Sequence, residues 1–139
     1  MRIYLDSNIF IYAYECETDL GHAARRAFAL IDERDAVGVT SELTLAEVLP
    51  RPLKEQNAAL EHAYEAVFHG RQGMETYPLC LSILRLSAPL VAQSSLRQVD
   101  ALHVATAIDA ACDVFLTEDR RVRVPAGVRL LNLSDRMFS

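Results

Sequence analysis

The sequence predicts an α/β fold, a three-layer α/β/α sandwich with a central, mostly parallel sheet. Short apolar runs alternate along the chain with longer segments of helical periodicity, the pattern of strand and crossover helix. Hydrophobic residues make up 51% of the chain and charged residues 24%, so a substantial core can form. The length of 139 residues is that of one ordinary domain, and we expect a single domain over 1–139.

The predicted strands are short and bounded by helical or polar segments. They lie at residues 2–5, 36–40, 74–79, 114–117 and 127–133. The first, RIYL, and the fourth, VFLT, are expected to be buried. The stretch 118–127 is the most polar irregular part of the chain and is predicted to be a loop.

The predicted helices fill the intervals between these strands. They lie at residues 7–15, 21–35, 41–49, 54–70, 81–95 and 100–113. Pro50 and Pro52 are expected to kink or end the third helix, because proline has no N–H to donate to the preceding turn. The last helix is rich in alanine and apolar on most of its circumference, so it is predicted to be buried.

Composition argues against several classes of protein. No apolar run reaches the roughly 18 residues that cross a bilayer, and the N-terminus lacks a signal-peptide pattern, so no membrane partner is expected. Cys16, Cys80 and Cys112 form no CxxC pair, which makes a disulfide framework or a zinc site unexpected and favours a reducing cytoplasm. The net charge of −5 argues against broad, nonspecific nucleic-acid binding but allows a local basic surface.

Several acidic residues are expected at the carboxyl edge of the sheet, where open α/β folds bind their ligands. Asp6 directly follows the first strand, and Asp119 lies shortly after the fourth. Glu47 belongs to the helix that starts after the second strand. Asp100 begins a helix that leads back into the fourth strand, which places the start of that helix near the strand's carboxyl end. The four acids are therefore predicted to converge.

Each acid also has a purely structural alternative. Asp6 and Asp100 could cap the helices that follow them, and Glu47 could close a capping box in TLAE if its helix starts late. Asp119 could be an ordinary turn residue. Several carboxylates forced together repel one another, however, and a bound cation is the usual remedy. Oxygen ligands without thiolates or a histidine cluster favour Mg²⁺ or Mn²⁺, and such a site suits phosphodiester hydrolysis.

Three segments resemble the signature blocks of the PIN-domain family, and most closely the VapC-type toxin ribonucleases of toxin–antitoxin pairs. These segments are YLDSNIFIYAY, TSELTLAEVL and VDALHVATAIDAACDVFLTEDRRV. They cover nearly the whole chain in the family's order, and the third block is the most specific. The resemblance implies an α/β/α sandwich whose acidic pocket holds Mg²⁺ or Mn²⁺. It also implies an RNA substrate, a homodimer, and an antitoxin that blocks the pocket.

The resemblance assigns roles by position. The family's four acids fall on Asp6, Glu47, Asp100 and Asp119, and its polar pocket residues fall on Asn8 and Thr117. It implies that Asp6 and Asp100 ligate the metal most directly, whereas Glu47 and Asp119 bind directly or through water. Three features depart from the pattern. The aromatic residue that is common after the family's last motif is missing from DRRVRV. Glu118 replaces a common Asn, so either the pocket has a fifth acid or Glu118 points away, and Pro50 sits where many relatives continue the helix.

Other residues are weighed beside the acids. His103 shares a helical face with Asp100 and could be a ligand or general base, although a histidine of this kind more often packs in support of a site. RNA binding needs positive charge, because phosphates dominate affinity. The candidates for RNA contact are Arg51, Lys54, Arg97, Arg120 and Arg121. For any one of them, solvated surface charge is the ordinary alternative.

Two other functions are considered. A phosphatase of haloacid-dehalogenase type also places an Asp after its first strand, but it wants a second Asp two residues later, where this chain has Asn8. A noncatalytic PIN-fold binding module would keep the fold without the chemistry, and the presence of all four acids argues against it.

Overall fold

The computed structural model describes residues 1–135 and 138, and its sheet is fully parallel. Five strands lie in the order β3–β2–β1–β4–β5. Their bounds are β1 Arg2–Leu5, β2 Val37–Ser41, β3 Met74–Tyr77, β4 Val114–Leu116 and β5 Arg129–Leu131. The predicted strands and the predicted parallel sheet are confirmed.

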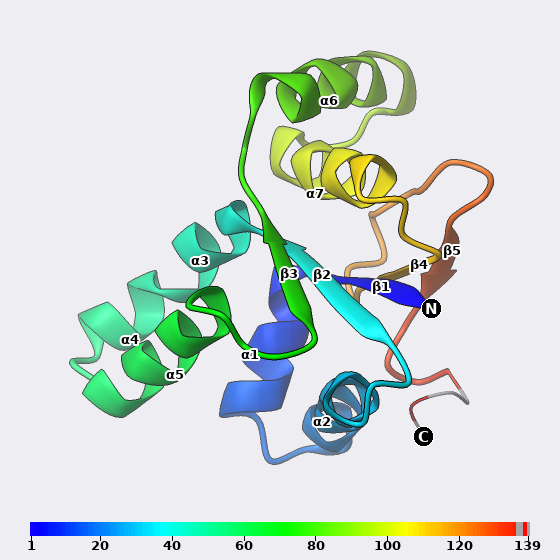
Figure 1. The fold of residues 1–139 in the computed structure, drawn as a ribbon. Helices are drawn as coiled ribbons and strands as arrows, with labels where there is room; N and C mark the ends of the chain where they lie inside the picture. Colours follow the sequence, from blue (N-terminus) through cyan, green and yellow to red (C-terminus); the bar gives the residue numbers. More distant parts are fainter. Residues whose placement is uncertain (136–137, 139) are drawn as a thin grey trace.

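Helices cover the sheet in two layers (Figure 1). Their bounds are α1 Ser7–Glu15, α2 Asp19–Asp32, α3 Glu42–Val48, α4 Pro50–Lys54, α5 Ala58–Phe68, α6 Leu81–Ser94 and α7 Gln98–Asp109. Helices α6 and α7 form one layer, with α7 against the sheet and α6 packed on α7, and the helices α1 to α5 lie toward the other side. The predicted three-layer α/β/α architecture is confirmed.

Alternation along β1 sends its side chains into two separate cores. Ile3 and Leu5 pack with residues of α1 and α2, whereas Tyr4 packs with Val104 of α7 and Phe115 of β4. Because side chains two residues apart share a face of a strand, Asp6 continues the side that Tyr4 occupies. The strand therefore delivers Asp6 toward α7.

The centre of the sheet is also its switch point, because β1 has β2 on one side and β4 on the other. Leu5 is in register with Leu116, and the Asp6 N–H donates to the Leu116 carbonyl at 3.1 Å. Strands β1 and β4 therefore end side by side, and the chain leaves both of them at the same edge of the sheet. Crevices at such points are where open α/β sheets place their ligands.

Several helix boundaries differ from the prediction. Pro50 does end α3, as expected, but it also occupies the first position of the separate helix α4, where its missing N–H costs nothing. The helix predicted from residue 54 therefore begins only at Ala58, after the cap Asn57. The helix predicted over 100–113 spans Gln98–Asp109 instead. Among the described helices none is long and apolar enough to span a membrane, and all three cysteine thiols are free.

Candidate active site

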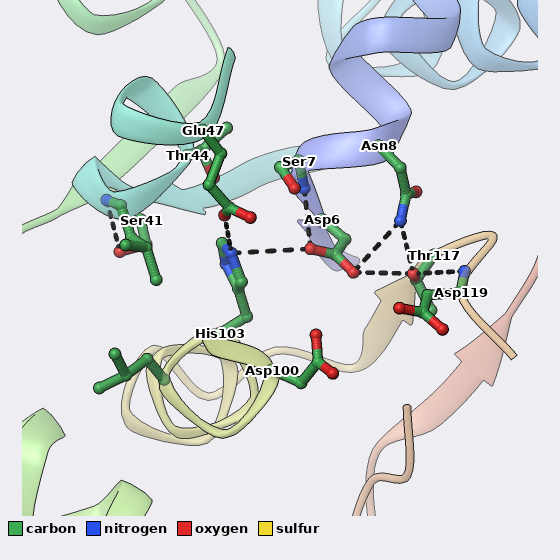
Figure 2. Close-up of polar contacts among 12 residues, drawn as sticks. Asp6, Ser7, Asn8, Ser41, Thr44, Glu47, Asp100, His103, Thr117 and Asp119 are labelled. Atoms are coloured by element: carbon green, nitrogen blue, oxygen red, sulfur yellow. Dashed lines mark hydrogen bonds and ion pairs between the residues drawn. The ribbon is translucent and has the colours of Figure 1, made fainter. Parts of the chain in front are cut away.

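Asp6 is both a helix cap and a member of an acidic cluster. Its Oδ1 accepts a hydrogen bond from the Ser7 N–H at 2.8 Å, which caps α1. Its Oδ2 accepts from the Thr117 hydroxyl at 2.7 Å, and its side chain is only 5% exposed. Figure 2 shows the carboxylate facing α7, with Asp100 on the other side of the same space. The capping alternative is thus confirmed for Asp6 and is compatible with a place in the cluster.

Thr117 and Asn8 tie the end of β1 to the end of β4. The Thr117 hydroxyl donates to Asp6 and accepts from the Asn8 amide at 3.1 Å and from the Asp119 N–H at 3.0 Å. The Asn8 carbonyl oxygen accepts from the Glu118 N–H at 3.1 Å. These two uncharged side chains therefore hold Asp6 and the segment that carries Asp119 in one fixed arrangement (Figure 2).

Glu47 lies in the last turn of α3 and reaches the cluster through His103. The cap of α3 is Ser41, whose hydroxyl accepts from the Leu43 N–H, so the capping-box alternative for Glu47 is wrong. His103 Nε2 lies 2.5 Å from Glu47 Oε1 and 3.7 Å from Asp6 Oδ1. The histidine is 1% exposed and bridges the two acids from the face of α7 (Figure 2).

Asp100 and Asp119 form the other half of the cluster and share Arg97. Asp100 is the third residue of α7, whose N-cap is Arg97, so the capping alternative for Asp100 is wrong. The Arg97 guanidinium lies 2.9 Å from Asp100 Oδ2 and 3.1 Å from Asp119 Oδ2. Asp119 Oδ1 also accepts from the Arg121 N–H at 2.9 Å, which confirms the turn alternative. Asp119 is thus a turn residue that reaches the cluster.

Burial and neighbouring charges shift the pKa values of several side chains in this cluster. Burial raises the pKa of Asp6, and the charge of Glu47 adds to the rise, although His103 and the hydrogen bonds oppose it. Burial alone would lower the pKa of His103, but its hydrogen bond to Glu47 and the surrounding carboxylates raise it overall. The Arg121 hydrogen bond lowers the pKa of Asp119. The site therefore contains negative and positive groups that shift one another's pKa values.

The donor set fits a hard divalent cation in its chemistry, because the converging side chains are carboxylates. The four carboxylates lie in two pairs and do not surround one common point. Asp6 and Glu47 meet at His103, and Asp100 and Asp119 meet at Arg97. Within residues 1–135 and 138, no three His, Cys, Asp or Glu side chains are grouped as a ready-made ion shell. A cation at this edge would therefore have to rearrange these pairs.

Glu118 points away from the acidic cluster. Its Oε1 accepts a hydrogen bond from the Leu133 N–H beyond β5, while its own N–H is held by Asn8. Of the two possibilities open for Glu118, the structure shows the one in which its carboxylate is turned away. Glu118 departs from the family pattern, but it does not add a fifth acid to the cluster.

The predicted RNA contacts fall into two groups. Arg97 and Arg121 contact the acids directly, Arg121 through two nitrogen atoms 3.0 Å from Asp119. Arg51 instead pairs with Glu15 and Glu55, on α1 and just beyond α4. Lys54 and Arg120 are exposed. Basic side chains at the acidic edge thus come from just before the third sequence block and from its C-terminal end.

The contribution of Tyr4 was not expected from the sequence. Its hydroxyl lies 2.6 Å from His103 Nδ1, and its ring stacks on Phe115. The signal was present, because Tyr4 and Asp6 are two residues apart on a strand and must share a face. A buried tyrosine also needs a partner for its hydroxyl, and His103 is that partner.

Comparison with known proteins agrees with this fold. The sequence model of the PIN domain family matches residues 3–128. None of the curated proteins searched matches the chain. The fold is similar to that of VapBC2 from Rickettsia felis, solved bound to a DNA fragment from its promoter, with a TM-score of 0.70, 19% identity, and coverage of 95% of this chain and 98% of that one.

Two further solved structures share the fold. VapC20 of Mycobacterium tuberculosis, a toxin that cleaves the sarcin–ricin loop, gives a TM-score of 0.67 at 14% identity, covering 81% of this chain and 86% of that one. A toxin–antitoxin complex from Klebsiella pneumoniae gives 0.64 at 18% identity, covering 91% and 99%. At these identities the likeness is one of fold, and it agrees with the architecture described above.

Proposed function

The chain belongs to the PIN domain family, and on this premise we propose that it is a metal-dependent endoribonuclease of VapC type, the toxin of a toxin–antitoxin pair. One observation carries the proposal: carboxylates from four separate segments gather at the carboxyl edge of a parallel sheet, beside its switch point. Nucleases that hydrolyse phosphodiesters need such a group of hard ligands.

The residues that would hold Mg²⁺ or Mn²⁺ are Asp6 and Asp100, with Glu47 and Asp119 binding directly or through water. A cation bound there would polarise a phosphate oxygen and lower the pKa of an attacking water. The remaining residues act on the acids. Thr117 and Asn8 hold the Asp6 carboxylate in place, and His103 holds Glu47 beside the acidic cluster. Such support keeps the ligands oriented before substrate arrives.

RNA is the proposed substrate. The acids alone would repel a polyanion, but Arg97 and Arg121 bring two guanidinium groups to the same edge. One of the structural neighbours is a toxin that cleaves the sarcin–ricin loop, and we extend that general chemistry to this chain. The overall charge of −5 then favours a selective substrate over indiscriminate binding.

Two protein partners complete the proposal. An antitoxin would cover the acidic edge. One structural neighbour was solved as a toxin–antitoxin complex, which supports an antitoxin as a partner. A second copy of the chain would cover the apolar stripe of α6, formed by Leu81, Leu84 and Val91, which are all exposed. These residues recur at helical spacing beside the buried face of α6, so they form one continuous surface.

The phosphatase alternative gains no support from the geometry. Asn8, at the position where that chemistry wants a carboxylic acid, is fixed by hydrogen bonds to Thr117 and to the Glu118 N–H. An amide in this place can orient neighbours but cannot exchange a proton with a leaving group at neutral pH.

The test is cleavage of total RNA by the purified protein in Mg²⁺, in Mn²⁺ and in EDTA. We expect fragments with defined ends in either metal and intact RNA in EDTA. A parallel incubation with a phosphate monoester, followed by a search for phosphorylated Asp6, separates the two chemistries. Intact RNA in every buffer, or a trapped phosphoaspartate, would contradict the proposal.

A further inference from the structure

The Arg97 guanidinium contacts both carboxylate oxygens of Asp100. Its Nε lies 2.9 Å from Asp100 Oδ2, and its Nη2 lies 3.2 Å from Asp100 Oδ1, the two-pronged contact that suits a guanidinium and a carboxylate. The same Nη2 lies 3.1 Å from Asp119 Oδ2. One side chain of the protein itself thus supplies the positive charge between two of the four acids.

The two bridging side chains in the cluster differ in how firmly they are held. His103 is 1% exposed, lies within a buried turn of α7, and has Tyr4 on its second nitrogen. Arg97 is 54% exposed and sits at the N-cap, where the backbone is extended before the helix begins. Arg97 can therefore turn into solvent with no rearrangement of α7, whereas His103 cannot leave without opening the core.

The position of Arg97 sets up a competition. Both oxygens of Asp100 face the guanidinium, and a divalent cation at those oxygens would meet a positive group within contact distance. Like charges at that separation repel strongly in a partly buried site, and Asp100 is only 6% exposed. Arg121 also pairs with Asp119, but it makes no ion pair with Asp100 among the described residues. Arg97 is thus the group that a metal ion would have to move.

We infer that Arg97 is a built-in counter-cation that a divalent metal ion displaces from Asp100 and Asp119, so that Arg97 sets the metal concentration at which the site fills. The inference rests on the proposed function, because it concerns the same acids. In the metal-free protein the single positive charge of Arg97 offsets part of the negative charge of Asp100 and Asp119. In the metal-bound protein its guanidinium is released at the edge of the site.

The experiment is a calorimetric titration of Mn²⁺ into the full chain and three variants. Arg97→Gln removes the charge and the fork, and we expect it to bind Mn²⁺ about fivefold more tightly than the wild type, the effect of losing one partly exposed ion pair. Arg97→Lys keeps the charge but not the two-pronged contact, and its affinity should fall between these two. Arg120→Gln is the matched control, since Arg120 is exposed beside Asp119 in the segment after β4 and its loss removes an equal charge.

The outcomes separate the inference from the function beneath it. Tighter binding by Arg97→Gln, with Arg120→Gln within about twofold of the wild type, supports displacement. If the wild type binds Mn²⁺ and Arg97→Gln binds no more tightly, or if Arg120→Gln tightens equally, the inference fails and the metal site stands. If no variant binds Mn²⁺, the inference and the proposed metal dependence fail together. Circular dichroism of each variant confirms that it is folded before titration.

Discussion

His103 and Glu47 lie 56 positions apart in the sequence, yet the imidazole Nε2 is 2.5 Å from the Glu47 carboxylate. The Tyr4 hydroxyl occupies the other ring nitrogen at 2.6 Å, so Nε2 is the nitrogen that faces the acids. The contact joins α7 to the last turn of α3 and passes within 3.7 Å of Asp6. The buried histidine thus organises half of the acidic cluster, and its protonation should be measurable in the stability of the fold.

The pH dependence of stability tests this contact. The pKa of His103 is raised in the folded chain, so its stabilising effect is complete below the unfolded value and is lost as pH rises through the folded value. In EDTA, the free energy of unfolding should therefore fall between about pH 6 and about pH 8. The pKa of Asp6 is also raised, so Asp6 likewise lowers the free energy of unfolding as pH rises, beginning at lower pH.

The matched variant for that measurement is His103→Gln, which keeps a side chain able to donate a hydrogen bond but cannot titrate. Urea unfolding at the two pH values should give a smaller decrease for the variant than for the wild type. Equal decreases in the two proteins would show that His103 does not carry the effect.

Substitution of Thr117 tests the hydrogen bonds that hold Asp6. Thr117→Val keeps the shape but leaves Asp6 Oδ2 and the Asp119 N–H without their buried partner. We expect the free energy of unfolding to fall by about 1–3 kcal/mol, the cost of orphaned buried polar groups. Thr117→Ser keeps the hydroxyl and is the control. Urea unfolding in which the valine variant is as stable as the serine variant would contradict this account.

The apolar stripe on α6 predicts self-association. Leu84 is 44% exposed at the centre of this stripe, and Leu84→Asp should shift the protein toward the monomer, because a charge would be buried at the interface. Gln93→Asp places the same charge on the opposite face of α6 and should leave the assembly unchanged. Sedimentation velocity at several concentrations provides the readout. A wild-type protein that is monomeric throughout would remove the basis for the homodimer.

Much of the fold could be predicted from the sequence because its elements are locally determined. The strands at 2–5 and 114–117 are apolar and follow or precede clear helices, and both were confirmed at their predicted places. The boundaries near Pro50 were less predictable. A proline can end one helix and begin another, and the choice depends on how residues 50–54 pack, which periodicity does not report.

The candidate site, like the fold, could be predicted from the sequence only in part. The edge on which Asp6, Glu47, Asp100 and Asp119 gather follows from the order of strands and helices, and the structure brings these residues together in two pairs. The pairing itself depends on which nitrogen of His103 faces outward and on where the Arg97 side chain turns. Those are choices of rotamer and tertiary contact, and no pattern in one sequence encodes them.

The rate of RNA cleavage by Asp6→Asn, compared with Asp35→Asn, tests the central claim most directly. Asparagine can still cap α1, so the first substitution removes a charge from the cluster while keeping the local fold. Asp35 is exposed in the turn before β2, at the opposite edge of the sheet. With Mn²⁺ present, we predict a loss of about 100-fold or more for Asp6→Asn and wild-type cleavage for Asp35→Asn. Cleavage at the wild-type rate by a folded Asp6→Asn would contradict the assignment of this edge as the active site.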